Sequence, residues 1–260
     1  MNATPLRVQI GELARRSITQ TLRQPALIVP PIFFPLMLVA VNASGLQAAT
    51  NIPGFPTDNY VDFAIAVAFI QGALFAMINA GSALARDVET GFLRRLAMTP
   101  MQRPALLLGH LTGVLLVALG SSLIYVLVGW IAGMHMAAGA GGVLGVLVLA
   151  MLIALGFAAL GALIGLRTGS GEAVQGVFPL FFVLLFLSSS SLPRPLIEHD
   201  WFRTIATYNP ISYLIEGIRA LIIEGWDGEA LALAFGIAIA IAVLALAGAS
   251  QALRTRLVRT

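Results

Sequence analysis

The chain consists of long apolar stretches separated by short segments that carry most of its charge. Six stretches approach or exceed the length of about 20 mostly apolar residues that a helix needs to cross a hydrocarbon core of about 30 Å. They cover residues 26–44, 61–85, 105–133, 142–166, 173–192 and 230–249. The pattern predicts an all-α integral membrane protein with six transmembrane helices. We expect one domain overall, with an amphipathic helix over residues 1–25 and the six spans within residues 26–260.

The first apolar stretch is interrupted by Pro30, Pro31 and Pro35. The residues at 41–43 resemble a signal-peptide cleavage site, but the region of about 25 residues before the stretch is too long for a signal peptide. We therefore expect an uncleaved span. The prolines should kink or break its helix, which a bilayer tolerates only where neighbouring protein groups satisfy the freed carbonyls.

The arginines divide unevenly between the two sides that six spans would define. Twelve fall on the side of the termini: Arg7, Arg15, Arg16, Arg23, Arg86, Arg94, Arg95, Arg103, Arg167, Arg254, Arg256 and Arg259. Three fall on the other side: Arg194, Arg203 and Arg219. Because cytoplasmic loops carry an excess of basic residues, this split predicts that both termini are cytoplasmic.

Before the first span, Leu6, Ile10, Leu13, Ser17 and Thr21 recur at helical spacing, and the arginines of this segment lie largely off that stripe. The spacing predicts an amphipathic helix lying along the inner face of the membrane. The alternative is a generic positively charged anchor.

A short cytoplasmic helix is predicted between the second and third spans, within residues 86–100. Phe92, Leu93 and Leu96 make a small apolar face, and Pro100 ends the helix at Thr99. Charges beside exposed apolar residues indicate a docking surface for a soluble partner. A solvated loop with a topogenic charge cluster is the alternative.

Residues 193–229 link the fifth and sixth spans and contain two apolar pieces, 196–206 and 211–223, that are too short to cross. This length predicts two interfacial or re-entrant helices. Asn209 can cap the second piece while Pro210 takes its first helical position. Glu216 and Arg219 are spaced to pair on one helix face. An ionisable pair near the membrane is a candidate functional site, unless it only stabilises a packed outer helix.

Composition supports the membrane assignment and excludes several chemistries. Hydrophobic residues make up 58% of the chain, charged residues 10%, and the mean hydropathy is +0.92. The absence of cysteine excludes disulfides and thiolate metal sites, and no metal site is expected. The absence of lysine excludes a P-loop, so the chain is not expected to be an ATPase. The pI near 9.9 does not indicate nucleic-acid binding, because the arginines are dispersed at span boundaries.

Two other classes of membrane protein fit the sequence less well. An intramembrane enzyme lacks support because the sequence has no catalytic motif, and His110, His135 and His199 are isolated. The serine run at 188–191 could line a polar path, but serines at the end of a span commonly bond the backbone. A secondary transporter or channel would place ionisable residues at mid-membrane, and the middles of these spans carry none. Three G-x-x-x-G matches give weak support for close helix packing.

Two motifs resemble the permease subunits of type-2 ABC exporters, the ABC-2 type. One is Glu89-x-Gly91-x-Leu93-x-x-Leu96-x-x-Thr99-Pro100, followed by Arg103 and Gly109. The other is Asn209-Pro210-x-x-Tyr213-x-x-Glu216-x-x-Arg219 before the last span. Together with six spans and a preceding amphipathic helix, the resemblance covers essentially the whole chain.

The resemblance implies roles for both motifs. It implies that the first is a coupling helix in a groove of an ATPase subunit, formed by Glu89, Gly91, Phe92, Leu93, Arg94, Arg95, Leu96, Thr99 and Pro100. It implies that the second belongs to an outer gate, with Asn209, Pro210, Tyr213, Glu216 and Arg219.

The resemblance also implies partners. Two copies of a cytoplasmic ABC ATPase would bind ATP and magnesium, and this chain would hold no cofactor. A second permease copy is expected, as a homodimer or with a sister permease, in the inner membrane of a bacterial cell.

The composition of the spans also bears on the substrate class. The uncharged span interiors favour an amphipathic or hydrophobic cargo, drug-like or lipid-like. A polysaccharide or lipid-linked glycan is the alternative, since Phe181, Phe182 and Phe186 could line a wide channel.

Overall fold

The computed structural model describes residues 6–97 and 103–258, and within these ranges the chain is helical, with no strand. The helices are α1 (Leu6–Leu22), α2 (Pro25–Leu46), α3 (Tyr60–Glu89), α4 (Phe92–Ala97), α5 (Arg103–Ile131), α6 (Gly139–Thr168), α7 (Gly171–Phe186), α8 (Asp200–Tyr208), α9 (Pro210–Arg219) and α10 (Gly228–Val258). Two 3₁₀ turns, Gln47–Asn51 and Arg194–Leu196, and a π turn, Ala220–Glu224, complete the described elements.

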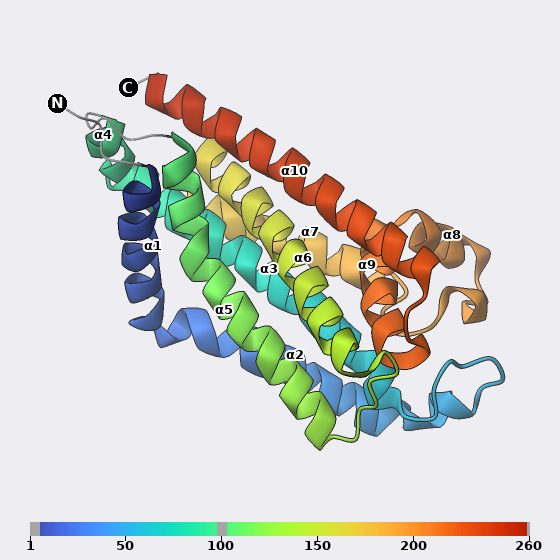
Figure 1. Ribbon diagram of the computed structural model, residues 1–260. Coiled ribbons are helices and arrows are strands. Elements are labelled where there is room, and N and C mark those ends of the chain that lie inside the picture. The colour runs from blue at the N-terminus through green and yellow to red at the C-terminus, as the bar shows by residue number, and fades with distance from the viewer. Residues whose placement is uncertain (1–5, 98–102, 259–260) are drawn as a thin grey trace.

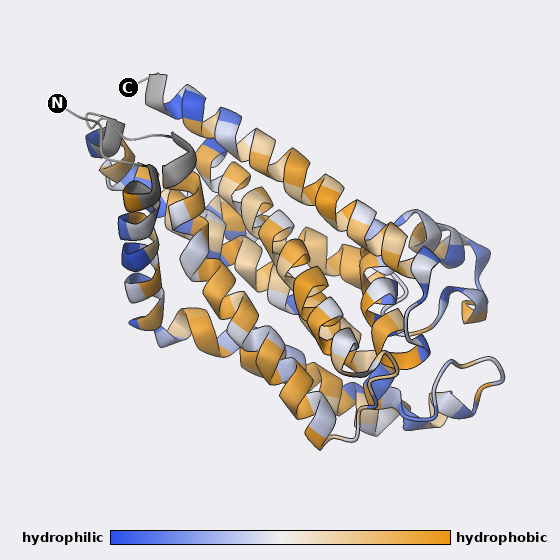
Figure 2. Cartoon of the chain, in the orientation of Figure 1, coloured by the Kyte–Doolittle hydropathy of each residue, from blue (hydrophilic) through white to orange (hydrophobic). Residues whose placement is uncertain are grey.

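An elongated bundle is formed by helices that run alongside one another, namely α2, α3, α5, α6, α7 and α10 (Figure 1). The short helix α4 lies at one end, close to both chain ends, and α8 and α9 lie at the opposite end. We call these the α4 end and the α9 end. Polar residues concentrate at the two ends, and apolar residues cover the length between them (Figure 2).

Of the helices in the described part of the chain, five are long and apolar enough to cross a membrane: α2, α3, α5, α6 and α10. Helix α7 is also apolar but has only 16 residues, about 24 Å at 1.5 Å per residue. The expected span at 173–192 therefore runs too far, because the helix ends at Phe186 and residues 187–190 form turns.

Helix α3 is the centre of the bundle, and 72% of the residues in its most apolar 18-residue segment are buried. It lies against α6 at a contact made by glycines. A Cβ on Gly161 would overlap the backbone carbonyl of Met77, and one on Gly165 would overlap that of Gly81. The G-x-x-x-G match at 161 and 165 therefore marks a true helix contact, in which small residues let two backbones approach.

Helix α2 runs unbroken through its prolines, and neighbouring helices satisfy the carbonyls that two of them free. Proline has no N–H to donate to the carbonyl four residues earlier. Pro31 therefore frees the carbonyl of Leu27, which accepts a bond of 3.1 Å from the Asn79 side chain of α3. Pro35 likewise frees the carbonyl of Pro31, which accepts from the Tyr125 hydroxyl of α5.

Helix α1 packs on α5, whereas the sequence predicted only that its stripe lies along the inner face of the membrane. The Ser17 hydroxyl donates to the carbonyl of His110 at 2.8 Å, and Gly113 leaves room for the Ser17 backbone. Thr21 of the same stripe is buried. The polar members of the stripe therefore face protein.

We predict that Gly161→Ala lowers the free energy of unfolding by about 1–3 kcal/mol, because the new methyl group forces α3 and α6 apart. The midpoint of thermal or detergent-induced unfolding in micelles measures the change. The matched control is Gly236→Ala in α10, where an added Cβ meets no atom within 4 Å. Equal midpoints for the two variants would show that the close contact contributes no stability.

Candidate functional site

The predicted coupling segment is two helices joined at a glycine. Helix α3 ends at Glu89, and Gly91 has a positive φ of 68°, a conformation that glycine adopts at little cost. Helix α4 then covers Phe92–Ala97. The expectation of one helix from Glu89 to Thr99 is therefore wrong at its start, because Glu89 belongs to α3. Thr99 and Pro100 lie outside the described residues.

The apolar face expected on this segment is largely occupied within the chain. Leu93 is buried in a cluster with leucines of α5 and α10. Phe92 is half-buried, whereas Glu89 and Arg95 are exposed. The side chains of Arg94 and Leu96 are not among those described. The described surface that this segment offers to a partner is therefore mainly polar and charged.

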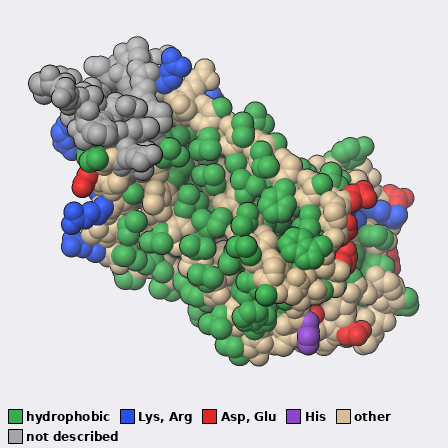
Figure 3. All heavy atoms as spheres, in the orientation of Figure 1, with side chains coloured by type: hydrophobic (Ala, Val, Ile, Leu, Met, Phe, Trp, Pro, Cys, Tyr) green, Lys and Arg blue, Asp and Glu red, His purple; other side chains and the backbone are tan. Residues whose placement is uncertain are grey.

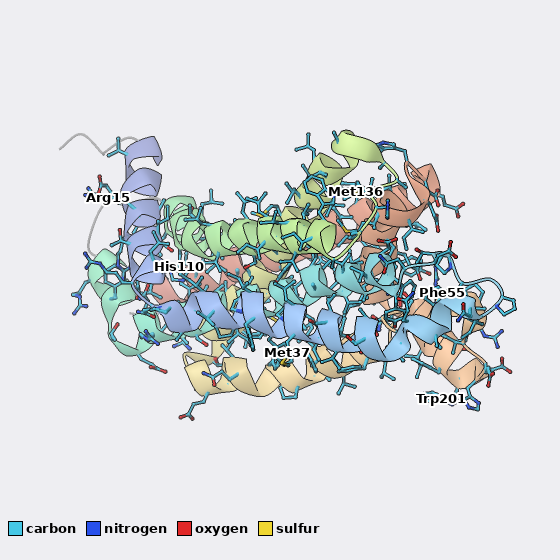
Figure 4. All side chains as sticks on the ribbon, turned by 90° about the horizontal axis from the view of Figure 1, so that it is seen from below. Arg15, Met37, Phe55, His110, Met136 and Trp201 are labelled. Carbon is cyan, nitrogen blue, oxygen red and sulfur yellow. The ribbon has the colours of Figure 1, made fainter. Side chains whose placement is uncertain are left out.

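A buried carboxylate joins the elements around α4. Asp87, near the end of α3, accepts a hydrogen bond of 3.2 Å from Arg16 of α1, and its second oxygen lies 3.8 Å from Nδ1 of His110. The guanidinium of Arg16 also lies 3.8 Å from the centre of the Phe92 ring. His110 sits where α1 meets α5 (Figure 4). The Arg16–Asp87 junction thus links α1, α3, α4 and α5.

At the α9 end, Asn209 acts at two helix ends. Its side-chain oxygen accepts from the N–H of Ile211 at 3.0 Å and caps α9, and Pro210 takes the first turn, as predicted. Its amide group also donates to the carbonyls of Leu184 and Leu187 at 2.7 and 3.1 Å. One side chain therefore starts α9 and fixes the end of α7.

Glu216 pairs with Arg194 and not with Arg219, so the predicted pair on one helix face is wrong. Arg194 donates from Nε and Nη2 to the two carboxylate oxygens of Glu216 at 2.8 and 2.6 Å. Its guanidinium also lies 4.6 Å from the centre of the Tyr213 ring. Burial opposes the charge of Arg194, but Glu216 raises its pKa overall. A bidentate geometry is stronger than the single contact that an i,i+3 spacing offers.

Arg219 instead donates its described hydrogen bonds to backbone carbonyls. It donates to those of Phe63, Ser189 and Ser190 at 3.0, 2.5 and 2.7 Å, and its guanidinium lies 3.3 Å from the centre of the Phe63 ring. Burial lowers the pKa of Arg219 to about 9, which leaves the guanidinium charged at neutral pH. Within the serine run, Ser188, Ser189 and Ser190 are buried and Ser191 is exposed, so in the described structure the run supplies two of the carbonyls that hold Arg219.

A cavity of about 370 Å³ opens at the α9 end, beside α9 and the start of α10. Its wall combines apolar and charged side chains: Pro56, Phe63, Pro193, Arg194, Pro195, Tyr213, Glu216, Arg219, Ile223, Glu224, Asp227, Glu229 and Leu233. Three of the five residues of the predicted gate, Tyr213, Glu216 and Arg219, therefore line one space. Asn209 and Pro210 position α9 from outside this lining.

Sequence reasoning missed the partners that the fold brings to these residues. Arg194 counted only as one of three arginines on its side, although its place between Pro193 and Pro195 marks a stiff turn. Asp87 and Arg16 are 71 residues apart. The only local signal for the Arg16–Asp87 junction was the carboxylate of Asp87, two residues before the coupling motif begins at Glu89.

The bundle of long apolar helices with polar ends defines the class: this is a multi-pass α-helical membrane protein. The model of the family described as ABC-2 type transporter matches residues 8–223. The chain therefore belongs to the ABC-2 type transporter family, the membrane family of ABC transporters, and membership implies association with an ABC ATPase subunit.

Three relatives agree with this membership. The chain is 23% identical over 199 residues to the daunorubicin resistance ABC transporter permease protein DrrB1 of Streptomyces coeruleorubidus, covering 75% of this chain and 67% of that protein. It is 28% identical over 214 residues to the putative transport permease ycf38 of Porphyra purpurea, covering 81% and 72%. The ycf38 protein of Pyropia yezoensis is 29% identical over 217 residues, covering 82% and 73%.

We predict that Arg219→Lys lowers the free energy of unfolding by at least about 2 kcal/mol. A single ammonium group does not reproduce the fork that satisfies three carbonyls, and unsatisfied buried acceptors cost about 1–3 kcal/mol each. Arg203→Lys is the control, since Arg203 lies at the same end and its side chain is 44% exposed. If thermal unfolding gives the two variants the same midpoint, the carbonyl cluster does not hold the α9 end together.

Proposed function

We propose that the chain is the permease subunit of an ATP-driven exporter that moves an amphipathic or hydrophobic molecule, drug-like or lipid-like, out of the cytoplasm or inner leaflet. The observation that carries this proposal is the Arg16–Asp87 junction, which ties α4 and its exposed Arg95 to the bundle at the end opposite the cavity. The name of the DrrB1 relative, a drug-resistance permease, favours a drug-like substrate. A polysaccharide or lipid-linked glycan is the second candidate within the same family.

In this proposal α7 also crosses the membrane, as the fifth of six spans with α10 as the sixth, and α8 and α9 are interfacial or re-entrant helices at the outer side. The uneven division of arginines supports a cytoplasmic α4 end with both termini inside. Red acidic side chains gather at the α9 end of the face in Figure 3, and blue basic ones at the α4 end. Trp201 on α8 is 62% exposed and points away from the bundle (Figure 4), a typical position for an aromatic residue at a membrane interface.

The proposed partners are two copies of an ABC ATPase and a second permease, most simply another copy of this chain in a bacterial inner membrane. ATP and magnesium would be bound by the ATPase. Closure of the ATPase pair would push on Glu89, Arg95 and the rest of the coupling segment. Because Arg16 contacts both Phe92 and Asp87, the push would move α1, α3 and α4 as a rigid body.

We predict that Arg95→Glu lowers substrate-stimulated ATP turnover about tenfold, the effect of losing roughly 1.4 kcal/mol at the contact with the ATPase. The assay uses the chain reconstituted with its ABC ATPase in liposomes. Arg23→Glu is the matched control, an exposed arginine of the same end that lies outside α4. The coupling role is refuted if turnover in Arg95→Glu equals that of the control.

The Arg16–Asp87 junction is tested by exchanging its charges. We predict that Arg16→Asp and Asp87→Arg each lower the amount of substrate transported per ATP several-fold, because each leaves like charges facing one another. The double variant should recover most of the loss. Arg15→Asp, on the exposed face of α1, is the control for a change in charge alone. Failure of the double variant to exceed either single variant would contradict transmission through this pair.

A further inference from the structure

The contacts of Arg194 are those by which proteins recognise an organic cation. Glu216 offers both carboxylate oxygens, and the Tyr213 ring offers its face at 4.6 Å. A carboxylate beside an aromatic face attracts a cation through charge and through the ring quadrupole. The side chains of Arg194 and Glu216 remain 27% and 24% exposed, so the pair borders the cavity and is not sealed in the core.

Arg194 differs from Arg219 in what its removal would cost. Arg219 satisfies three buried carbonyls, so its departure would leave backbone acceptors without partners. The described hydrogen bonds of the Arg194 guanidinium both go to Glu216. Arg194 lies between Pro193 and Pro195 and is the first residue of the short 3₁₀ turn Arg194–Leu196. Arg194 can therefore leave without exposing a backbone group.

The cavity beside this pair suits a cation with an apolar body. Its volume of about 370 Å³ falls in the range of small-molecule sites, about 300–1,000 Å³. Phe63, Ile223 and Leu233 supply apolar wall. Three further carboxylates, Glu224, Asp227 and Glu229, also line it.

The charge of the whole α9 end favours the same ligand. It holds eight acidic residues against three arginines, a net charge of −5: Asp58, Asp62, Glu198, Asp200, Glu216, Glu224, Asp227 and Glu229 against Arg194, Arg203 and Arg219. A surface of one sign raises the local concentration of ligands of the opposite sign.

We propose that Tyr213 and Glu216 form a binding site for a monovalent organic cation with an apolar body, and that Arg194 is a tethered ion that fills this site when it is empty. The inference rests on the proposed function, since it makes the cation a cargo at the exit. An arriving cation takes the place of the guanidinium, so Glu216 is paired before and after the exchange. Removing one partner of a buried pair without replacement is strongly unfavourable, and the exchange avoids that state. The released 3₁₀ turn loses its bond to α9, which widens the cavity.

The test measures binding of tetraphenylphosphonium to the purified full chain in lipid nanodiscs, with empty nanodiscs as the correction for partition into lipid. Tetraphenylborate, an anion of the same shape, is the matched probe for charge. The wild-type chain should bind the cation and not the anion. Arg194→Gln, which removes the competing charge and keeps a hydrogen-bonding side chain, should tighten binding at least about fivefold. Arg194→Ala should do the same if it folds.

Glu216→Gln and Tyr213→Leu should each weaken binding of the cation at least about tenfold. Arg203→Ala should leave it unchanged, and a thermal unfolding curve for each variant shows that it is folded. Equal binding of both probes, or weaker binding in folded Arg194→Gln, would overturn the proposal. The binding assay contains no ATPase and no ATP. Failure of the cation site therefore leaves ATP-coupled export open, and failure of coupling at α4 leaves the binding result intact.

Discussion

The interior of a bilayer supplies no water to a backbone carbonyl, and this constraint governs the described structure from one end to the other. Every proline within a helix, like every helix end, frees a polar group that the protein itself must satisfy. Helix α2 shows how this is done. Pro31 and Pro35 free the carbonyls of Leu27 and Pro31, and α3 and α5 return a side chain to each, Asn79 and Tyr125.

The same requirement shapes the α9 end. Helix α7 stops at Phe186, two residues before the serine run begins, and the carbonyls of Leu187, Ser189 and Ser190 in the following turns accept bonds from α9 and its cap. Asn209 and Arg219 donate to five carbonyls of this region, including that of Phe63 at the start of α3. These bonds make a rigid support for α9. Against that support, the pair of Arg194 and Glu216 stands out because no described hydrogen bond of its guanidinium or carboxylate goes to the backbone.

Local physics was enough to predict the features that depend on neighbours in the sequence. Length and hydropathy located the long helices, and the Asn209-Pro210 dipeptide predicted the start of α9, because capping involves only the first turn. The wrong predictions concern residues that could pair either with a neighbour in the sequence or with a residue far along the chain. Glu216 and Arg219 are three residues apart, yet Glu216 pairs with Arg194, 22 residues earlier, and Arg219 reaches Phe63, 156 residues away. Helical periodicity in the sequence predicts contacts only between residues three or four apart, so it could not predict these pairs.

The prediction of a docking face on the coupling segment is incomplete for a related reason. The apolar positions of a short helix indicate that something covers them, but they do not say whether the cover is a partner or the chain itself. Leu93 is covered by α5 and α10, and Phe92 by Arg16. The polar positions Glu89 and Arg95 remain outside. In a helix as short as α4, the apolar residues of the motif therefore indicate packing against the bundle as much as binding of a partner.

Helix α3 connects the two ends that the proposed function needs to connect. It carries Asp87 at the α4 end, and at the α9 end it offers the carbonyl and ring of Phe63 to Arg219. Its glycine contact with α6 is too close for the two helices to slide without separating, because Gly81 and Gly161 each leave no space for a methyl group. In the proposed function, a push on α4 would be carried along α3, a helix of 30 residues, to the base of α9. Since α9 also bears Tyr213 and Glu216, a movement at the ATPase side would reach the site that holds Arg194 without any change in the intervening helix.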